Sequence, residues 1–146
     1  MLLLGTRNST DQELAVDALV NLGEVYRRFD KKGQCGCRAF EFNGSSILLQ
    51  QAGIYHLTAV IEFTAPAVGD VTFQLAEDGV LSPVAIATDT VATATTEFNN
   101  VVLDVYILVN NNITLNTVNA TKSISIVNVG VESTVTNIVV NVEKVA

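Results

Sequence analysis

The sequence predicts an all-β fold, an antiparallel sandwich or barrel, and two observations lead to it. The composition favours pleated sheet, since 22 Val and 15 Thr are stiff at the β-carbon and pack well on such surfaces. Apolar and polar residues also alternate through short segments, and turn signals separate these segments about every 8–12 residues, as in sandwiches and barrels. A chain of 146 residues suits one domain.

The charge balance narrows the classes of function. The formal net charge is -7 and the pI is about 4.5. Binding of nucleic acid needs clustered Lys and Arg, so we expect no nucleic-acid partner. No run approaches 18 apolar residues, so we also expect no insertion into a membrane. Only 16% of residues are charged, below the usual share of about 25%. The surface is therefore built from uncharged polar side chains, covered in part by partner subunits, or both.

The first segment of the chain gives mixed signals. We expect residues 1–19 to form an N-terminal arm, either docking or disordered, because a polar run follows the opening apolar residues. That opening run is too short for a signal peptide. Residues 14–29 fit two interpretations, since Leu14, Ala18 and Leu22 form a helical stripe whereas residues 20–29 also alternate like a strand. We favour the strand for residues 20–29.

Regular strand signals begin after a polar, glycine-rich loop at residues 30–37. The clearest strand covers Ile54 to Ala65, with Tyr55 to Phe63 at alternate positions on one face. Asn43-Gly44 and Asp78-Gly79 predict hairpin turns. The expected strands, nine or ten in all, lie near residues 20–29, 40–42, 47–49, 54–65, 71–76, 80–97, 98–109, 113–118, 123–129 and 135–145.

The segment at residues 98–109 is apolar on both faces. Alternate positions from Val101 to Val109 suit a core, and the positions between them include Val102, Tyr106 and Leu108. A neighbouring subunit can cover the second face of such a strand. The alternative is a strand at the centre of a large sandwich that covers both faces itself.

Two short motifs resemble a known superfamily. Gly53-Ile54-Tyr55-His56-Leu57 is similar to the strand of the tumour-necrosis-factor and complement-q globular heads in which a buried Tyr follows a Gly. The run from Val71 through Gln74-Leu75 to Asp78-Gly79-Val80 resembles the next strand and hairpin of that superfamily, and residues 135–145 resemble its last strand. The likeness covers residues 20–146, and stand-alone bacteriophage and Gram-positive bacterial members are the most similar.

The resemblance implies an antiparallel, ten-stranded jelly-roll sandwich over residues 20–146 that assembles as a homotrimer. Members of the superfamily are generally non-catalytic and work in adhesion, receptor binding or decoration. Two departures bear on function, since we see neither a collagen-like stalk nor a transmembrane segment. These departures favour a virion component, either a capsid decoration or a head fibre.

The trimer interface is expected on the face opposite the core. The residues that we assign to it are His56, Val60, Val102, Tyr106 and Leu108. His56 is the single histidine, so any zinc site or Ser-His-Asp chemistry would depend on it. Three interpretations of His56 stay open: a polar interface residue, an ion or pH-sensitive site near a threefold axis, and a catalytic base.

A second group of residues predicts docking onto an acidic surface such as a capsid shell. Its members are Arg27, Arg28, Lys31, Lys32, Cys35 and Cys37, and Arg38 lies beside them. A solvated loop is the alternative for the basic residues. The Cys35-Gly36-Cys37 thiols are compatible with free cysteines, with disulfides or with a metal shared between chains, because one chain supplies only two of the usual four ligands.

Carboxylates in turns are candidate ligands for calcium. Glu77 and Asp78 share a hairpin, and Asp70 and Asp89 lie in other turns. Calcium takes six to eight oxygen ligands, and the chain has no EF-hand run, so we predict no metal. The chain also lacks a phosphate loop, a dinucleotide fingerprint and a nucleophile elbow, so we predict no cofactor and no enzyme activity.

The sequence therefore leaves three functions to be distinguished. The first is a trimeric virion protein that contacts capsid or other virion proteins and, through its head, the host surface. The second is a bacterial surface adhesin or a head domain that binds a glycan or receptor. The third, an enzyme, lacks a catalytic inventory.

Overall fold

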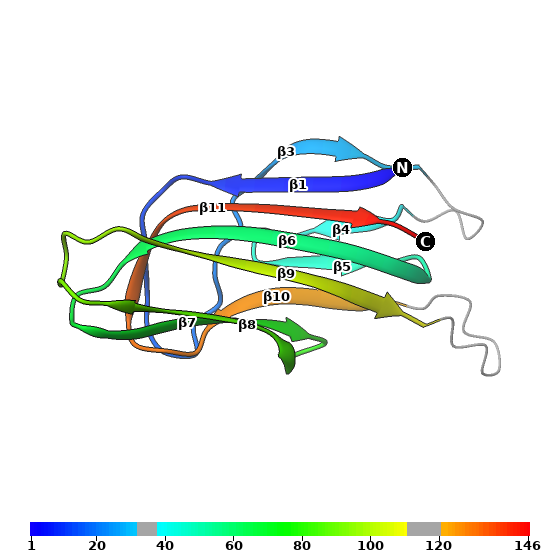
Figure 1. Cartoon of the computed structure of the whole chain (residues 1–146). Helices are drawn as coiled ribbons and strands as arrows, with labels where there is room; N and C mark the ends of the chain where they lie inside the picture. Colours follow the sequence, from blue (N-terminus) through cyan, green and yellow to red (C-terminus); the bar gives the residue numbers. More distant parts are fainter. Residues whose placement is uncertain (32–37, 111–120) are drawn as a thin grey trace.

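Two antiparallel sheets face each other in the computed structural model, which describes residues 1–31, 38–110 and 121–146 (Figure 1). One sheet has the order β3-β1-β11-β6-β9, with β2 beside β11, and the other has the order β4-β5-β10-β7-β8. The first sheet consists of β1 (Leu2–Asn8), β2 (Gln12–Leu14), β3 (Glu24–Phe29), β6 (Gly53–Thr64), β9 (Asn99–Val109) and β11 (Ser133–Lys144). The second consists of β4 (Phe40–Phe42), β5 (Ser46–Leu49), β7 (Gly69–Glu77), β8 (Val80–Val91) and β10 (Lys122–Asn128).

This architecture confirms the predicted all-β, antiparallel sandwich of jelly-roll type. Each sheet has a continuous row of five strands, with β2 beside β11, and β1 and β2 are the described strands that we did not predict. Several predicted segments correspond to strands nearly residue for residue, among them residues 54–65 in β6 and residues 135–145 in β11. The strand expected at residues 113–118 lies outside the described residues.

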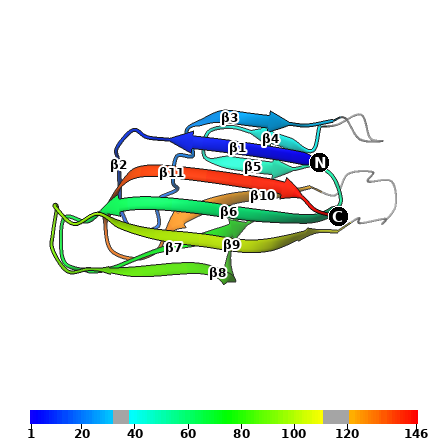
Figure 2. The same ribbon diagram turned by 45° about the horizontal axis from the view of Figure 1, so that its top comes forward.

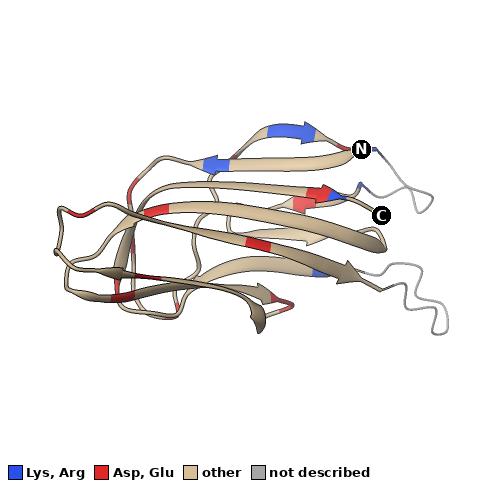
Figure 3. Cartoon of the chain, in the orientation of Figure 1, with Lys and Arg blue, Asp and Glu red and all other residues tan. Residues whose placement is uncertain are grey.

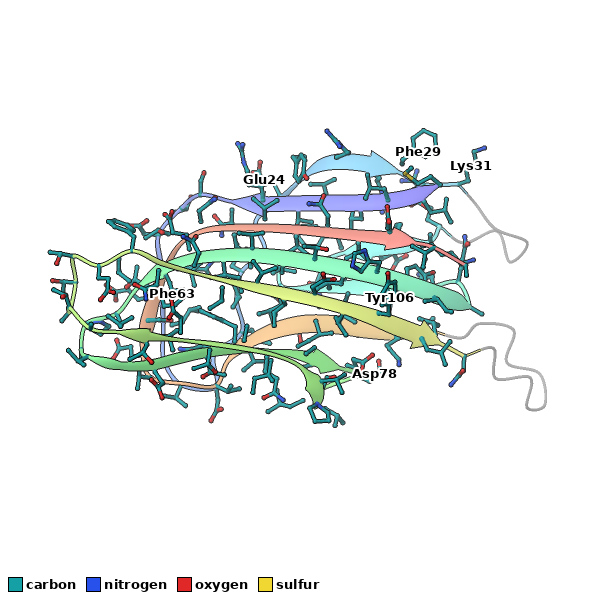
Figure 4. The ribbon with its side chains drawn as sticks, viewed as in Figure 1. Glu24, Phe29, Lys31, Phe63, Asp78 and Tyr106 are labelled. Carbon is teal, nitrogen blue, oxygen red and sulfur yellow. The ribbon has the colours of Figure 1, made fainter. Side chains whose placement is uncertain are left out.

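The core lies between the sheets and follows from strict alternation along β6. Tyr55, Leu57, Ala59, Ile61 and Phe63 are all buried, as predicted for one face of this strand. From Leu57 to Phe63, the partners of these residues on β11 are buried too, and Phe63 meets Phe73 of the opposite sheet with ring centroids 5.5 Å apart. Figure 4 shows Phe63 on β6 at one end of the sandwich. Removing this apolar area from water is the main stabilising contribution.

Tyr55 brings a polar group into the buried face of β6. Its hydroxyl donates to the Gln51 carbonyl oxygen at 2.7 Å, and its ring meets Phe40 edge to face at 5.8 Å. Burial raises the pKa of this phenol to about 12, because the charged form loses its hydration. The expectation of a buried Tyr directly after the Gly53-Ile54 start of the strand is confirmed.

The predicted N-terminal arm at residues 1–19 is wrong for most of its length. Leu2–Asn8 forms β1, which pairs with β11 from Leu2 opposite Lys144 to Asn8 opposite Ile138. Leu4 is fully buried in the core. The apolar start of the chain therefore completes a sheet, because β11 would otherwise expose a row of unpaired backbone groups along this side.

The ambiguous residues 14–29 contain no helix. Glu24–Phe29 forms β3, so the strand interpretation holds for the second half of the segment. It begins later than we predicted because Gly23 has φ 81, a left-handed conformation that extended strands do not contain. Before it, the chain crosses toward the other sheet, where Leu19 forms an isolated bridge with Val127.

The predicted hairpins are both present. Asp78 and Gly79 have φ values of 51 and 80 between β7 and β8, as the favoured two-residue hairpin turn requires. Gly44, with φ 101, turns the chain between β4 and β5, and Asn43 accepts the backbone N–H of Ser46 there at 2.8 Å. Local turn chemistry thus sets the register of both strand pairs.

Large-to-small substitution should separate core from surface. Phe73→Ala empties a fully buried position, and we expect it to lower the free energy of unfolding by about 3–5 kcal/mol. Phe98→Ala makes the same chemical change at a side chain that is 62% exposed, and should cost less than about 0.5 kcal/mol. Urea denaturation measures both values, and equal losses would contradict this assignment of the core.

Raising the pH should weaken the fold through Tyr55. Its pKa of about 12, against an ordinary value of 10.0, means that the folded chain holds this proton more tightly than the unfolded chain does. The stabilisation is complete below the unfolded pKa and is lost as the pH rises through the folded one. We expect the stability advantage of the wild type over Tyr55→Phe to shrink by about 2 kcal/mol from about pH 9 to about pH 12. Parallel pH profiles of urea denaturation for the two chains would contradict this.

Candidate functional site

The outward side of the six-stranded sheet, called here the outer face, carries every residue that we assigned to a trimer interface. In the register of β6 with β9, His56 lies opposite Tyr106 and Val60 lies opposite Val102. Leu108 continues the row beside Ile54. Val102, Tyr106 and Leu108 are 54%, 68% and 52% exposed, so this strand shows apolar side chains to solvent while its alternate residues fill the core.

His56 sits in a small polar and aromatic cluster on the outer face. Its Nε2 lies 2.5 Å from Asp104 Oδ1, and its ring stacks on Tyr106 with centroids 4.8 Å apart. Glu143 of β11 is its register partner on the other side. Asp104 and Glu143 were not predicted as neighbours of His56, because that contact depends on the register of β9 and β11 with β6. The cluster lies on an open sheet face, with Tyr106 standing out from β9 (Figure 4).

A second exposed apolar surface follows the free edge strand β8. Val80, Leu81, Val84 and Ile86 are exposed there, and Val84 reaches 77%. The pairing with β7 jumps from Gln74 opposite Ile86 to Ala76 opposite Leu81, so the residues between them bulge outward. Within the bulge, Ser82 and Ala85 are buried and Val84 faces solvent. Such a bulge, with Pro83 inside it, disfavours edge-to-edge pairing of sheets and leaves Val84 available for contact.

The predicted docking residues are divided between structural and free positions. Arg28 is structural, because its guanidinium donates to the Phe40 carbonyl oxygen at 2.5 Å and lies 3.4 Å from the Asp30 carboxylate. The Arg27 guanidinium lies over the Tyr26 ring, 5.8 Å from its centroid, and Lys31 is exposed just after β3. Figure 3 shows this basic charge on β3 and at the end of β1. Lys32, Cys35 and Cys37 lie outside the described residues.

The carboxylates of the turns do not meet at a common site. Glu77 pairs with Lys122 at 3.3 Å, and Asp78 accepts the backbone N–H of Ser123 at 2.8 Å. Asp70 accepts from the Thr90 hydroxyl at 2.6 Å, and Asp89 accepts from the Asn99 amide. Within residues 1–31, 38–110 and 121–146, three or more metal-binding side chains nowhere gather in one place.

A polar cavity of about 590 Å³ lies at the β3 edge of the six-stranded sheet, between the β1–β2 connection and β3. We call it the β1–β3 cavity. It is lined by Arg7, Asn8, Ser9, Thr10, Asp11, Gln12, Asn21, Gly23, Glu24, Val25 and Tyr26. We did not predict this cavity, because much of its wall comes from a segment that we expected to be an N-terminal arm.

Tyr26 forms the wall of the β1–β3 cavity nearest the outer face. The pairing of β1 with β3 jumps between Gly5 opposite Arg27 and Thr6 opposite Val25, which leaves Tyr26 in a bulge. Its ring lies directly over Gly5, where any Cβ would come within 2.8 Å of the ring. The Tyr26 hydroxyl donates to Asn141 Oδ1 of β11 at 2.6 Å. Bulge, glycine and hydrogen bond together hold the ring flat against the sheet.

Comparison with known proteins identifies the fold. No protein-family model matches the sequence, and no curated protein matches it either. The globular domain of zebrafish complement 1qA superimposes over 100% of this chain and 98% of its own, with a TM-score of 0.64 and 8% identity. The fold is TNF/C1q-like.

Two further solved structures agree with this assignment. Murine APRIL at pH 5.0 matches with a TM-score of 0.65 and 10% identity, covering 97% of this chain and 98% of its own. The PRD1 vertex protein P5 matches with a TM-score of 0.56 and 14% identity, covering 99% of this chain and 97% of its own. The TNF/C1q-like fold thus extends across the N-terminal residues, which our predicted domain boundary at residue 20 excluded.

Across the described ranges, no helix has the length and apolar character that crossing a bilayer requires.

Proposed function

We propose that this chain is a non-catalytic structural and binding protein that works as a homotrimer. The observation that carries the proposal is the exposed apolar row on the outer face of a TNF/C1q-like sandwich, in which Val60, Val102 and Leu108 face solvent. Burial of such side chains against another subunit is favourable at about 25 cal/mol per Å² of apolar surface. Families with this fold usually trimerise, which supports the same stoichiometry here.

The two exposed apolar surfaces fit a ring better than a twofold dimer. The outer face and the bulged edge of β8 are different surfaces of one protomer, and a contact between different surfaces closes into a ring when the rotation allows it. In the proposed trimer, the β8 edge with Val80 and Val84 packs against the outer face of the next protomer. This contact between protomers would also bury the pair of His56 and Asp104.

The proposal assigns no catalytic role to His56. This residue stacks on Tyr106 and pairs with Asp104 on an open sheet face. Catalytic bases ordinarily work in a cleft from which water is excluded. We therefore give this cluster a structural role in subunit contact.

We further propose that the trimer is a virion component, a capsid decoration or head fibre. A vertex protein of PRD1 has the same fold, and the exposed side chains of Arg27 on β3 and of Lys31 just after it suit an acidic partner. The alternative, a bacterial surface adhesin or glycan- or receptor-binding head, is favoured by one observation, the polar β1–β3 cavity.

Native mass spectrometry tests the trimer. We expect the wild type at three times the 15.6 kDa chain mass. Val102→Glu should shift the population to single chains, because three carboxylates would be buried without partners at an apolar contact. Val68→Glu is the control, since Val68 is exposed in a loop away from the outer face, and it should leave the trimer intact. A wild-type mass of 15.6 kDa would contradict the trimer.

Fractionation of the source organism tests the virion role. We expect peptides of this chain in purified particles, at a constant ratio to the capsid subunit, and expect Arg27→Glu to lower that ratio by reversing a basic contact. Val68→Glu again serves as the control. Recovery of the chain from the cell envelope and its absence from particles would contradict the virion role and support the adhesin.

A further inference from the structure

We infer that the β1–β3 cavity is a binding site for a neutral saccharide. This inference deepens the binding role proposed above and rests on it, but the site lies within one protomer and needs no trimer to be complete. The cavity volume of about 590 Å³ falls inside the range of small-molecule sites, roughly 300–1,000 Å³. It thus has room for a short oligosaccharide.

The walls of the cavity are fixed before any ligand arrives. The Gln12 side chain donates to the Asn21 carbonyl oxygen at 2.9 Å and accepts the Asn21 N–H at 2.8 Å. The Asn8 amide donates to the same carbonyl oxygen at 3.1 Å and accepts the Thr10 N–H at 3.0 Å. Gly23 packs directly against β1, since a Cβ at this position would lie 2.2 Å from the Arg7 carbonyl oxygen. A site held in this way loses little conformational entropy on binding.

The charged groups of the cavity, in contrast, are unengaged. Arg7 and Glu24 lie opposite each other in the pairing of β1 with β3. Their exposed side chains, and that of Asp11, form no hydrogen bond or ion pair with the described residues. Glu24 stands at the start of β3 (Figure 4). The cavity therefore offers carboxylate oxygens that accept and a guanidinium that donates, which is the combination that vicinal sugar hydroxyls satisfy.

Tyr26 supplies the apolar contact that a sugar needs. One side of its ring lies on Gly5, and the Arg27 guanidinium lies over the ring, 5.8 Å from its centroid. Tyr26 is still 46% exposed, so a sugar would contact the ring beside Arg27. The ring is already held by its hydrogen bond to Asn141, so little side-chain freedom is lost on contact. A flat, fixed aromatic ring beside polar groups is suited to the C–H face of a pyranose.

Charge favours a neutral ligand over an anionic one. Asp11 and Glu24 outnumber Arg7 in the cavity, and the whole chain carries a net charge of -7. A phosphate or an acidic sugar would therefore meet net repulsion. An apolar ligand would leave the exposed carboxylates without compensating contacts as they lose water.

The cavity and the proposed trimer surface lie at opposite edges of one sheet. The sheet order β3-β1-β11-β6-β9 puts three strands between β3, which lines the cavity, and β9, which carries Val102. Figure 2 shows β1 and β3 together along the edge away from β9. Three cavities on one proposed trimer would act multivalently on a surface that repeats the same sugar.

The test is a titration of the isotope-labelled full chain, followed through backbone amide NMR shifts. The probes are the neutral oligosaccharides lactose, maltotriose and chitotriose, with sialyllactose as the anionic comparison. We expect at least one neutral probe to saturate with a Kd of about 1 mM or tighter. The shifted amides should cluster at residues 8–12 and 21–26, and sialyllactose should bind more weakly than lactose.

Substitutions make the test specific to the cavity. We expect Glu24→Gln and Arg7→Gln each to weaken binding about tenfold, as removal of a charge-assisted hydrogen bond does. Glu132→Gln is the matched control, because Glu132 is exposed outside the cavity, and its Kd should not change. Tyr26→Phe should keep binding and Tyr26→Ala should abolish it, with thermal unfolding of both chains showing whether the fold persists.

Several outcomes would overturn the inference. These are no saturable shift with any neutral probe, shifts confined to the outer face, an unchanged Kd in Glu24→Gln, and tighter binding of sialyllactose than of lactose. Saturation of the same amides by a tripeptide but by no sugar would assign the cavity to a peptide instead. Native mass spectra of the same samples report the trimer separately, so failure of the site and failure of the assembly are distinguishable.

Discussion

The antiparallel pairing of β6 with β11 is the constraint on which the rest of this structure depends. β11 runs the length of the sheet between β6 and β1, and so joins the first strand of the chain to the centre of the fold. The register that places Ile61 beside Ile138 in the core also places Val60 beside Val139 on the outer face. A slip of one residue would exchange the two faces, so core and candidate surface are specified together.

The same sheet separates two kinds of surface. At the β9 edge, apolar side chains such as Val102 and Leu108 face water, which favours contact with another protein surface. At the β3 edge, a bulge lays Tyr26 over Gly5 beside a polar cavity. Assembly through one edge and ligand binding at the other can then operate in one protomer without competing for the same residues.

Alternation and turn chemistry made the centre of the fold predictable. β6 showed a strict period of two, and the Asp78-Gly79 turn required positive φ values that the structure contains. The assigned outer-face residues His56, Val60, Val102, Tyr106 and Leu108 were predictable for the same reason, since β9 alternates across both faces. Their neighbours Asp104 and Glu143 were not, because cross-strand partners depend on a register that spans distant parts of the chain.

What the sequence determined by itself was therefore local: the all-β class, the strands with regular alternation, the hairpin turns and the apolar second face of β9. What only the tertiary structure decided was long-range. The alternation of apolar and polar side chains in residues 2–8 is too weak to predict a strand. These residues form one because they pair with the edge of β11, more than a hundred residues later in the chain. The β1–β3 cavity exists for the same reason, since its walls meet only after that pairing has brought Arg7, Asn21 and Tyr26 together.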